Sequence, residues 1–353
     1  MAETRSATTM NPLQQLGNFG QSIWLDYIRR GLITSGELAR LVREDGLKGV
    51  TSNPAIFEKA IAGSTDYADA LRAIEENRDL GVMAIYEQLA IRDIQDAAGV
   101  LRPVYDQTKS RDGYVSLEVS PYLARDTEKT IAEARRLWKA VGGENVMIKV
   151  PGTPEGIPAI EQLISEGINI NVTLLFSMEA YERVAEAYLR GLEKLVASGG
   201  DPSRVASVAS FFISRIDSLV DSLLNAKIKA PANPQQSRLA AGLLGKVAIA
   251  NARLTYLRYQ EIFRDLRWDA LAKKGAQTQR VLWASTSTKN PQYRDVLYVE
   301  ELIGPDTVNT IPPATMDAFR NHGQPRASLT ENVAGARDVM ANLEQVGISM
   351  KQA

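Results

Sequence analysis

Runs rich in valine and isoleucine alternate with helical patterns along nearly the whole chain, and this alternation limits the possible folds more than any other feature. The runs indicate buried strands, because each is short, apolar and bounded by glycine, proline or polar turn residues. Eight candidate strands follow one another, at residues 22–28, 49–56, 114–121, 145–151, 170–177, 204–216, 280–288 and 307–314. Repeated strand–helix units predict an α/β fold with a parallel sheet, and eight units predict a closed (β/α)8 TIM barrel.

An open, doubly wound sheet is the competing α/β architecture. Such a sheet usually carries a glycine-rich phosphate loop after its first strand, and the sequence contains neither a GxGxxG nor a Walker-type motif. A chain of 353 residues is a suitable length for one barrel. We therefore predict a single barrel domain over residues 13–353, preceded by a flexible N-terminus over residues 1–12.

Local signals refine this picture. Residues 217–279, between the sixth and seventh predicted strands, exceed what a crossover needs and predict a helical insertion, with an exposed loop at 227–238 and a helix at 244–266. Thr34 and Glu37 match a capping box for a helix that Gly46 ends. Residues 330–347 predict a C-terminal helix.

Composition excludes several classes of function. The 41 basic and 42 acidic residues leave a net charge of −1, which argues against nucleic acid and anionic membranes as partners. The absence of cysteine and the single histidine, His322, exclude cysteine nucleophiles and argue against a Ser-His-Asp triad or a multi-histidine metal site. No run reaches the roughly 18 apolar residues of a membrane span, and the N-terminus lacks the apolar core of a signal peptide. These features predict a cytoplasmic protein without a metal, and they leave the oligomeric state open, a homo-oligomer included.

Polar residues recur in or just after the predicted strands. In a barrel, the carboxyl ends of the strands carry the functional groups, whereas the packed interior prefers branched apolar residues. A satisfied hydrogen bond at a strand end explains any one of them equally well, but together they indicate a lined pocket. The residues are Asp26, Thr51, Ser52, Asn53, Glu118, Lys149, Asn171, Thr173, Ser207, Ser210, Ser285, Thr286, Ser287, Asn309 and Thr310.

Lys149 is the most informative of these polar residues, because it interrupts the apolar run "NVMIKVP". It could form a buried ion pair with Glu118 or Asp26, or extend its ammonium to water from an edge strand. Alternatively, an apolar site disfavours the ammonium and favours a neutral amine that attacks a carbonyl to form a Schiff base. In a chain without cysteine, Lys149 is the best candidate nucleophile.

Other residues could serve such an enzyme. Asp26 and Glu118 lie in different apolar runs and are candidates for acid–base chemistry, or for neutralising Lys149. Asn53, Asn171 and Thr173 could bind sugar hydroxyls, although Asn53 before Pro54 also fits a turn. Arg215 and the segment "STSTK" (285–289) could bind phosphate, or form a solvated arginine and a Ser/Thr turn.

These motifs together resemble the transaldolase family, and the resemblance covers nearly the whole chain. The matching segments, in the family's order, are "WLDYIRRG", "GVTSNPAIF", "SLEVSPYLA", "MIKVPGTPEGI", "INVTLLFS", "SFFISRID" and "LWASTSTKNP". The resemblance implies a barrel like that of the class I aldolases. It also implies transfer of dihydroxyacetone from sedoheptulose 7-phosphate to glyceraldehyde 3-phosphate, a pentose phosphate pathway reaction with no cofactor. The products are erythrose 4-phosphate and fructose 6-phosphate.

The resemblance also implies a role for individual residues. Lys149 matches the Schiff-base lysine, and Asp26 matches the carboxylate that takes the proton of the C4 hydroxyl. Glu118 and Thr173 match the pair that holds a water for proton transfer. The positions that match substrate-binding residues are Asn53, Asn171, Ser210 and Arg215. Many relatives have a second phosphate-binding arginine after the seventh predicted strand, where the nearest residues here are Ser287 and Lys289. Ser285, Ser287 and Lys289 are therefore candidates for substrate binding from their residue types alone.

Two other functions remain open at the level of sequence. One is a fructose-6-phosphate aldolase-like enzyme that releases dihydroxyacetone, although those relatives tend to have glutamine at the position of Glu118 and tyrosine at that of Phe212. The other is a sugar-phosphate-binding barrel in which Lys149 is only ion-paired.

Overall fold

Eight parallel strands close into one barrel in chain order, as predicted. The computed structural model describes residues 10–75, 81–229 and 234–351. Strand β1 pairs with both β2 and β8, which closes the sheet. Each strand overlaps its predicted run. The strands are β1 (Gln21–Asp26), β2 (Gly49–Thr51), β3 (Tyr114–Glu118), β4 (Val146–Pro151), β5 (Ile170–Leu175), β6 (Ser207–Phe212), β7 (Arg280–Ala284) and β8 (Thr307–Ile311).

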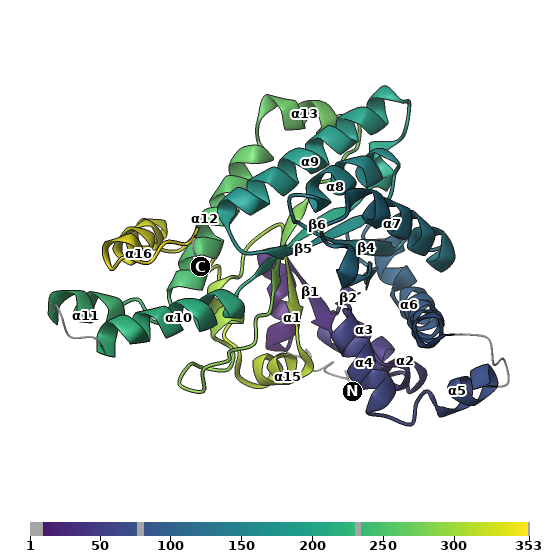
Figure 1. Ribbon diagram of the computed structural model, residues 1–353, viewed down its shortest axis with the longest axis horizontal. Coiled ribbons are helices and arrows are strands. Elements are labelled where there is room, and N and C mark those ends of the chain that lie inside the picture. Colours follow the sequence, from purple (N-terminus) through teal and green to yellow (C-terminus); the bar gives the residue numbers. More distant parts are fainter. Residues whose placement is uncertain (1–9, 76–80, 230–233, 352–353) are drawn as a thin grey trace, which may run out of the picture.

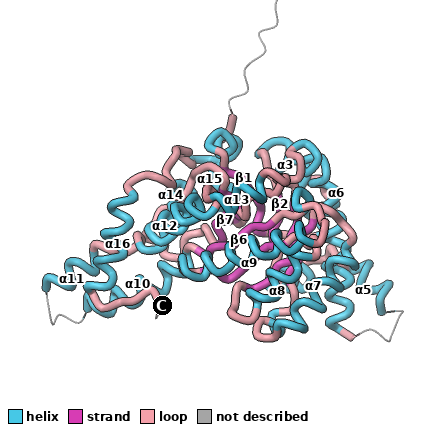
Figure 2. The backbone as a smooth tube through the Cα atoms, turned by 90° about the horizontal axis from the view of Figure 1, so that it is seen from above, coloured by secondary structure: helices cyan, strands magenta, loops and turns pink. Residues whose placement is uncertain are grey.

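Helices surround the barrel (Figures 1 and 2). Before β3 these are α1 (Pro12–Leu16), η1 (Gly17–Phe19), α2 (Arg30–Thr34), α3 (Glu37–Asp45), α4 (Pro54–Ala62), α5 (Ala68–Glu75) and α6 (Val82–Gln107). Between β3 and β6 they are η2 (Pro121–Leu123), α7 (Thr127–Val141), α8 (Gly156–Ser165), α9 (Met178–Ala197) and η3 (Pro202–Arg204). After β7 come α14 (Leu297–Glu301), α15 (Pro313–His322) and α16 (Val333–Gln345), the predicted C-terminal helix.

The long connection between β6 and β7 is helical, as predicted. It contains α10 (Ser214–Lys229), α11 (Pro234–Ala241), α12 (Val247–Ile262) and α13 (Leu266–Ala272). The predicted loop at 227–238 is shorter than expected, because α10 continues to Lys229 and α11 begins at Pro234. Residues 230–233 of that loop lie outside the described residues. Figure 1 shows α10 and α11 extending to one side of the barrel, near α16.

The predicted capping box at Thr34 and Glu37 is wrong. Residues Arg30–Thr34 form their own short helix, and the Thr34 hydroxyl donates to the carbonyl of Arg30 within it. The next helix starts at Glu37 after Gly36, which has a left-handed φ of 81° and, as a glycine, has no side chain to cap the helix. The predicted stop at Gly46 is confirmed, with a left-handed φ of 71°.

The predicted flexible N-terminus covers residues 1–12, of which residues 1–9 lie outside the described residues. Residues 10–12 are described. The Asn11 side chain caps α1, and its amide donates to Asp45 at 2.9 Å.

The barrel interior has an apolar layer below a polar one. Residues two apart on a strand face the same side, so each apolar interior residue predicts the orientation of the residue two positions further on. The apolar layer includes Trp24, Met147, Val208, Leu282 and Val308, which belong to one buried cluster. Two residues closer to the carboxyl ends lie Asp26, Lys149, Ser210, Ala284 and Thr310. The strand pattern thus brings polar groups from several strands to one end of the barrel.

Gly49 makes room for the largest side chain of this apolar layer. A Cβ atom at Gly49 would lie 2.4 Å from Cδ2 of Trp24, so only glycine fits beside the indole. The Trp24 indole N–H donates to Asp112 at 3.2 Å. A side chain at position 49 would therefore force the layer beneath the polar groups to repack.

A buried ion pair closes the amino-terminal end of the barrel. Arg280 and Asp112 lie 2.8 Å apart, with side chains only 5% and 4% exposed. Ser22 accepts from Arg280 at 2.8 Å and donates to Asp112 at 2.7 Å. Although burial opposes it, Arg280 holds the pKa of the Asp112 carboxyl below its usual range. This end of the barrel is filled by a closed network of charged and polar groups.

None of the described helices combines the length and the apolar composition that crossing a membrane would require.

Candidate active site

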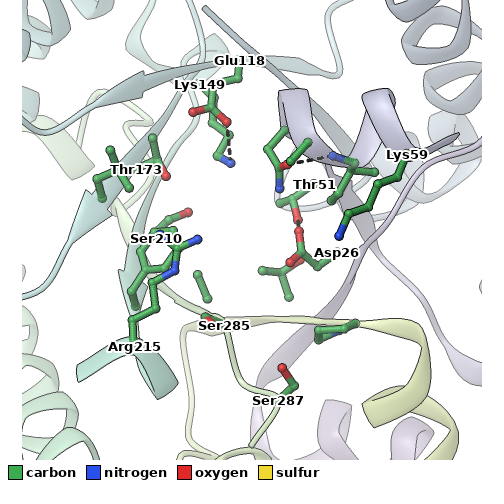
Figure 3. Close-up of a pocket in the computed structure, with 18 of the residues that line it drawn as sticks. Asp26, Thr51, Lys59, Glu118, Lys149, Thr173, Ser210, Arg215, Ser285 and Ser287 are labelled. Atoms are coloured by element: carbon green, nitrogen blue, oxygen red, sulfur yellow. Dashed lines mark hydrogen bonds and ion pairs between the residues drawn. The ribbon is translucent and has the colours of Figure 1, made fainter. Parts of the chain in front are cut away.

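A cavity of about 410 Å³ lies at the carboxyl ends of the strands, where the sequence predicts a lined pocket. Figure 3 shows that its side chains come from opposite walls and point towards a common space. The lining residues are Asp26, Thr51, Asn53, Ala55, Ile56, Lys59, Glu118, Lys149, Thr173, Leu174, Ser210, Phe212, Arg215, Ala284, Ser285, Ser287, Lys289, Thr310 and Pro312.

Lys149 lines this cavity and is paired with Glu118. Its Nζ lies 3.0 Å from Oε2 of Glu118, and the two side chains are 8% and 16% exposed. Nζ also donates to the carbonyl of Ser52 at 3.2 Å. The pairing follows from register, because Glu118 and Lys149 are direct neighbours on β3 and β4. The ion pair considered from the sequence therefore forms with Glu118, and the edge-strand alternative is excluded by the closed barrel.

Asp26 faces the same cavity from β1. Thr51, its neighbour in register on β2, donates to Oδ1 of Asp26 at 2.9 Å. The Thr51 and Thr310 hydroxyl oxygens lie 2.6 Å apart, which links β8 to the same chain of hydrogen bonds. Burial raises the pKa of Asp26 above its usual value, while the positive charge of Lys149 acts in the opposite direction. A carboxylate that holds a proton more readily is suited to accept one from a substrate.

Thr173 reaches the cavity beside an irregular step in β5. The pairing of β5 with β6 shifts between Val172 and Leu175. Thr173 and Leu174 lie inside that shift, and Leu174 has a left-handed φ of 64°. Such a conformation is uncommon for a residue other than glycine, and residues that adopt it are often found at functional sites. The step leaves Thr173 buried on the cavity wall, whereas Leu174 is 40% exposed at the rim.

The two asparagines singled out from the sequence have different positions. Asn53 lines the cavity and also caps α4, since its Oδ1 accepts from the backbone N–H of Ile56 at 3.0 Å. Asn171 is fully buried and is not among the lining residues. Its amide donates to Ser116 at 3.0 Å, and it accepts from the Ser210 hydroxyl at 2.7 Å. In this structure Asn171 supports Ser210, which itself lines the cavity.

Arg215 stands on the wall opposite Asp26 (Figure 3). Its guanidinium lies over the ring of Phe212, 4.6 Å from the centroid. Phe212 in turn packs against Phe176, with 5.3 Å between ring centroids. Arginine stacked on an aromatic ring keeps its hydrogen-bond donors free at the edge. Arg215 is therefore held in place with its donors available for an anion.

The segment after β7 contacts the start of α10 beside Arg215. Ser285 has a left-handed φ of 58°, and its hydroxyl lies 2.8 Å from that of Ser214, next to Arg215 in the chain. Lys289 donates to the Ser287 hydroxyl at 2.8 Å on the exposed rim. The structure thus brings most of the residues predicted for the site to one cavity. The exceptions, which are not among the lining residues, are Ser52, Asn171, Ser207, Thr286 and Asn309.

Some lining residues received no role from the sequence. Thr51 and Thr310 were recognisable as polar groups at strand ends, but their hydrogen bonds to Asp26 and to each other depend on the register of β1, β2 and β8. Lys59 was missed altogether. Its signal was helical spacing, because Asn53, Ile56 and Lys59 are three residues apart and share one face of α4.

Within residues 10–75, 81–229 and 234–351, no group of three or more acidic, histidine or cysteine side chains is arranged to hold a metal ion. The arrangement that is present combines a buried amine, two carboxylates and a cationic rim. It can form an imine with a carbonyl compound, move protons around it and bind an anionic group near the entrance.

Comparisons with known proteins point to one family. The family model "Transaldolase/Fructose-6-phosphate aldolase" matches residues 23–353. A protein of Trichodesmium erythraeum named "Transaldolase" is 51% identical over 341 residues, covering 96% of this chain and 89% of that protein. "Transaldolase 2" of Nostoc punctiforme is 52% identical over 342 residues, covering 96% and 89%. "Transaldolase" of Thermobifida fusca is 49% identical over 346 residues, covering 96% and 90%.

Proposed function

Because the chain belongs to the transaldolase/fructose-6-phosphate aldolase family, we infer that it is a transaldolase, a transferase that moves a three-carbon unit between phosphorylated sugars. The donor is sedoheptulose 7-phosphate and the acceptor glyceraldehyde 3-phosphate, and the products are erythrose 4-phosphate and fructose 6-phosphate. The observation that carries this proposal is the pairing of a buried Lys149 with Glu118 at 3.0 Å, with Asp26 in the same cavity.

Lys149 acts as the nucleophile. Glu118 accepts a proton from Nζ through their hydrogen bond, and the neutral amine attacks C2 of the ketose. The resulting alcohol leaves as water when Glu118 returns a proton, which produces a protonated imine. Thr173, on the next strand, holds the water that these proton transfers require.

Asp26 then breaks the bond between C3 and C4. It takes the proton of the C4 hydroxyl, the C4 oxygen forms a carbonyl, and the bonding electrons move into the protonated imine. The imine serves as the electron sink, so the step requires no metal. The four-carbon aldehyde phosphate leaves, and the three-carbon unit remains on Lys149 as an enamine.

The second half of the reaction reverses these steps. C3 of the enamine attacks the aldehyde carbon of glyceraldehyde 3-phosphate, and Asp26 gives its proton to the new hydroxyl. Water then hydrolyses the imine and releases fructose 6-phosphate. Asn53 and Ser210 hold hydroxyls of the three-carbon unit, with Asn171 fixing the orientation of Ser210.

Phosphate binding falls to the side of the cavity opposite Asp26. Arg215, stacked on Phe212, supplies a planar pair of donors for phosphate oxygens. Ser285, Ser287 and Lys289 supply further donors from the segment after β7. This assignment rests on the shared orientation of these groups and on the affinity of arginine for phosphate.

A trapping experiment tests the proposal. The protein is incubated with fructose 6-phosphate, borohydride is added to reduce any imine, and the modified peptide is identified by mass spectrometry. We expect a three-carbon adduct on Lys149. The Lys149→Arg variant should give none, because guanidinium stays protonated in proteins. Normal turnover by this variant, or an unmodified Lys149 in folded wild-type protein that binds the sugar phosphate, would contradict the mechanism.

The same preparation distinguishes transfer from release. Addition of erythrose 4-phosphate to the enamine-loaded protein should yield sedoheptulose 7-phosphate. Free dihydroxyacetone should stay far below the amount of transferred product. Predominant release of dihydroxyacetone would instead identify an aldolase.

A further inference from the structure

The mechanism above leaves one cation of the cavity without a role. The lining includes two carboxylates, Asp26 and Glu118, and four cationic side chains, Lys59, Lys149, Arg215 and Lys289. Cations therefore outnumber carboxylates by two, and Lys149 and Glu118 already neutralise each other. A sugar phosphate brings a charge of about −1.5 to −2, as phosphate monoesters do near neutral pH. Lys59 is the one cation of the lining that has a role neither in the chemical steps nor in the phosphate binding assigned above.

Helix α4 directs Lys59 into the cavity. Asn53 caps this helix and Pro54 begins it, which fixes where the first turn starts. Asn53, Ile56 and Lys59 then face the cavity, while Phe57 and Ala60 are buried on the other side of the helix. The orientation of Lys59 is thus set by the same element that holds Asn53 at the site.

The ammonium of Lys59 is unpaired. Across residues 10–75, 81–229 and 234–351, no carboxylate lies within ion-pair distance of its Nζ, and its side chain makes no hydrogen bond. Among the described lysines, only Lys129, Lys149 and Lys194 form ion pairs. What distinguishes Lys59 is therefore its place in the cavity lining, together with the absence of a partner. An unpaired ammonium over a cavity is available for a ligand.

Figure 3 shows where this ammonium lies relative to the other groups. Lys59 and Asp26 are on one wall, Arg215 is on the opposite wall, and Ser285 and Ser287 lie below the space between them. An anion in that space would have a fixed donor on one side and a flexible donor on the other. Arg215 is held by Phe212, whereas lysine has a long mobile stem and a compact charge.

We propose that Lys59 is a specificity-determining residue that binds the phosphate group of the substrates from the wall opposite Arg215. This inference rests on the proposed function, since it takes a phosphorylated sugar as the ligand. Lys59 selects for the phosphate and takes no part in imine formation or bond cleavage. It supplies a positive charge from the wall that carries Asp26, opposite Arg215.

The test replaces Lys59 by methionine, which keeps the length of the side chain and suits a helix. Transfer is measured with glyceraldehyde 3-phosphate and with unphosphorylated glyceraldehyde as acceptors. With Lys59→Met we expect kcat/KM for the phosphorylated acceptor to fall about tenfold, the size of one charge-assisted hydrogen bond. For glyceraldehyde the change should stay below about twofold. The inhibition constant for inorganic phosphate should rise by a similar factor, and Lys59→Arg should recover most of the loss.

Lys139→Met is the matched control, because Lys139 is exposed in the last turn of α7 and lies outside the cavity. It removes the same charge from the molecule and should leave both acceptors unaffected. Equal losses for both acceptors, or no loss for either, would overturn the role of Lys59. A wild-type protein that forms no adduct on Lys149 would instead overturn the proposed function, so the two failures are distinguishable.

Discussion

Lys149 is buried on an apolar strand, and its ion pair with Glu118 bears on both the cost of burying the ammonium and the chemistry of the amine. A lysine inside an apolar strand indicated either a buried ion pair or a Schiff-base nucleophile, and the structure contains a geometry that serves both. The ion pair with Glu118 offsets the free energy that burial of an ammonium costs. The same hydrogen bond gives the ammonium a proton acceptor. The choice of Glu118 over Asp26 could not be predicted, because it depends on the register of β3 and β4.

Asp26 should be needed for bond cleavage and dispensable for imine formation. We expect Asp26→Asn to form the imine with fructose 6-phosphate but not to break the bond between C3 and C4. Borohydride should then trap the intact six-carbon sugar phosphate on Lys149. A three-carbon adduct from this variant would assign the proton transfer to another group.

The raised pKa of Asp26 also predicts a pH dependence. A base must be deprotonated to act, and burial moves the deprotonation of Asp26 to higher pH than that of an ordinary aspartate. The rate of cleavage should therefore fall on the acid side at a pH above about 4, the usual pKa of aspartate. Single-turnover cleavage measured across pH checks this. A rate that stays constant down to about pH 4 would contradict it.

Arg215 should matter only for substrates that carry phosphate. We expect Arg215→Ala to lower kcat/KM for glyceraldehyde 3-phosphate by about 10- to 100-fold, because it removes charge-assisted hydrogen bonds to the phosphate. The loss should be much smaller for glyceraldehyde. Arg183→Ala, at an exposed position of α9, serves as the control. Similar losses for both aldehydes would remove Arg215 from the phosphate-binding role.

At the scale of elements, the sequence predicted where strands and helices occur better than how they begin, end or deviate. The eight apolar runs, Gly46 and the helical insertion are local signals of composition and period. The left-handed Leu174 is different, because nothing in "INVTLLFS" marks a shift of register with β6. The inward direction of Lys59 is likewise a property of α4 packed on the barrel.

Asp217 on α10 connects the first helix after β6 to two other segments of the chain, α12 and α14. One oxygen of Asp217 accepts from the backbone N–H of Ala248 at 2.8 Å, within the first turn of α12. The other accepts from the hydroxyl of Tyr298, on α14, at 2.8 Å. A second aspartate on α10, Asp221, accepts from Gly245 N–H and from Tyr293. These contacts join α10, which carries Arg215, to the start of α12 and to the connection that follows β7.

Asp217 should make stability depend on pH in a defined direction. Burial raises its pKa to about 6, against the hydrogen bonds from Ala248 and Tyr298. The folded chain therefore holds this proton more tightly than the unfolded chain, whose aspartate has a pKa of about 4. The contribution of Asp217 to the free energy of unfolding is greatest below about pH 4 and is lost as the pH rises through about 6.

Comparison with Asp217→Asn isolates this effect. The free energy of unfolding of the wild type minus that of the variant should fall by about 3 kcal/mol between about pH 4 and about pH 7. Urea unfolding followed by circular dichroism measures it. Asp201→Asn, at an exposed position outside these contacts, should show no such fall. A difference that stays constant with pH would show that Asp217 titrates like an ordinary aspartate.

At the scale of the whole molecule, the barrel separates two kinds of polar group. The amino-terminal end holds the buried Arg280 and Asp112 pair, and the carboxyl end holds the cavity. The closure of the barrel was predictable, because the order and number of apolar runs leave few alternatives. The ion pair at the amino-terminal end was not, since Arg280 and Asp112 are far apart in the sequence and meet only across the closed sheet.

Asp112→Ala should destabilise the protein without altering the chemistry. Removal of one partner leaves Arg280 buried without its counter-charge, which costs about 3 to 5 kcal/mol. We expect a lower midpoint of urea unfolding and an unchanged KM for fructose 6-phosphate. The double variant Asp112→Leu, Arg280→Met should recover much of the lost stability, because it removes both charges. A stable single variant, or one with altered KM, would contradict the separation of the two ends.

The stacking of polar groups over an apolar layer has a consequence for how new activities can arise on this scaffold. Trp24, Met147 and Val208 belong to one buried apolar cluster beneath the polar groups, and neither Lys59 nor Ser287 is part of it. Substitutions on the rim, at Lys59 or Ser287 for example, can change which aldehyde is accepted while the free energy of unfolding of the protein stays almost unchanged. Libraries confined to the rim should therefore retain a high fraction of folded members, and a designer could retune the acceptor range without first having to stabilise the parent.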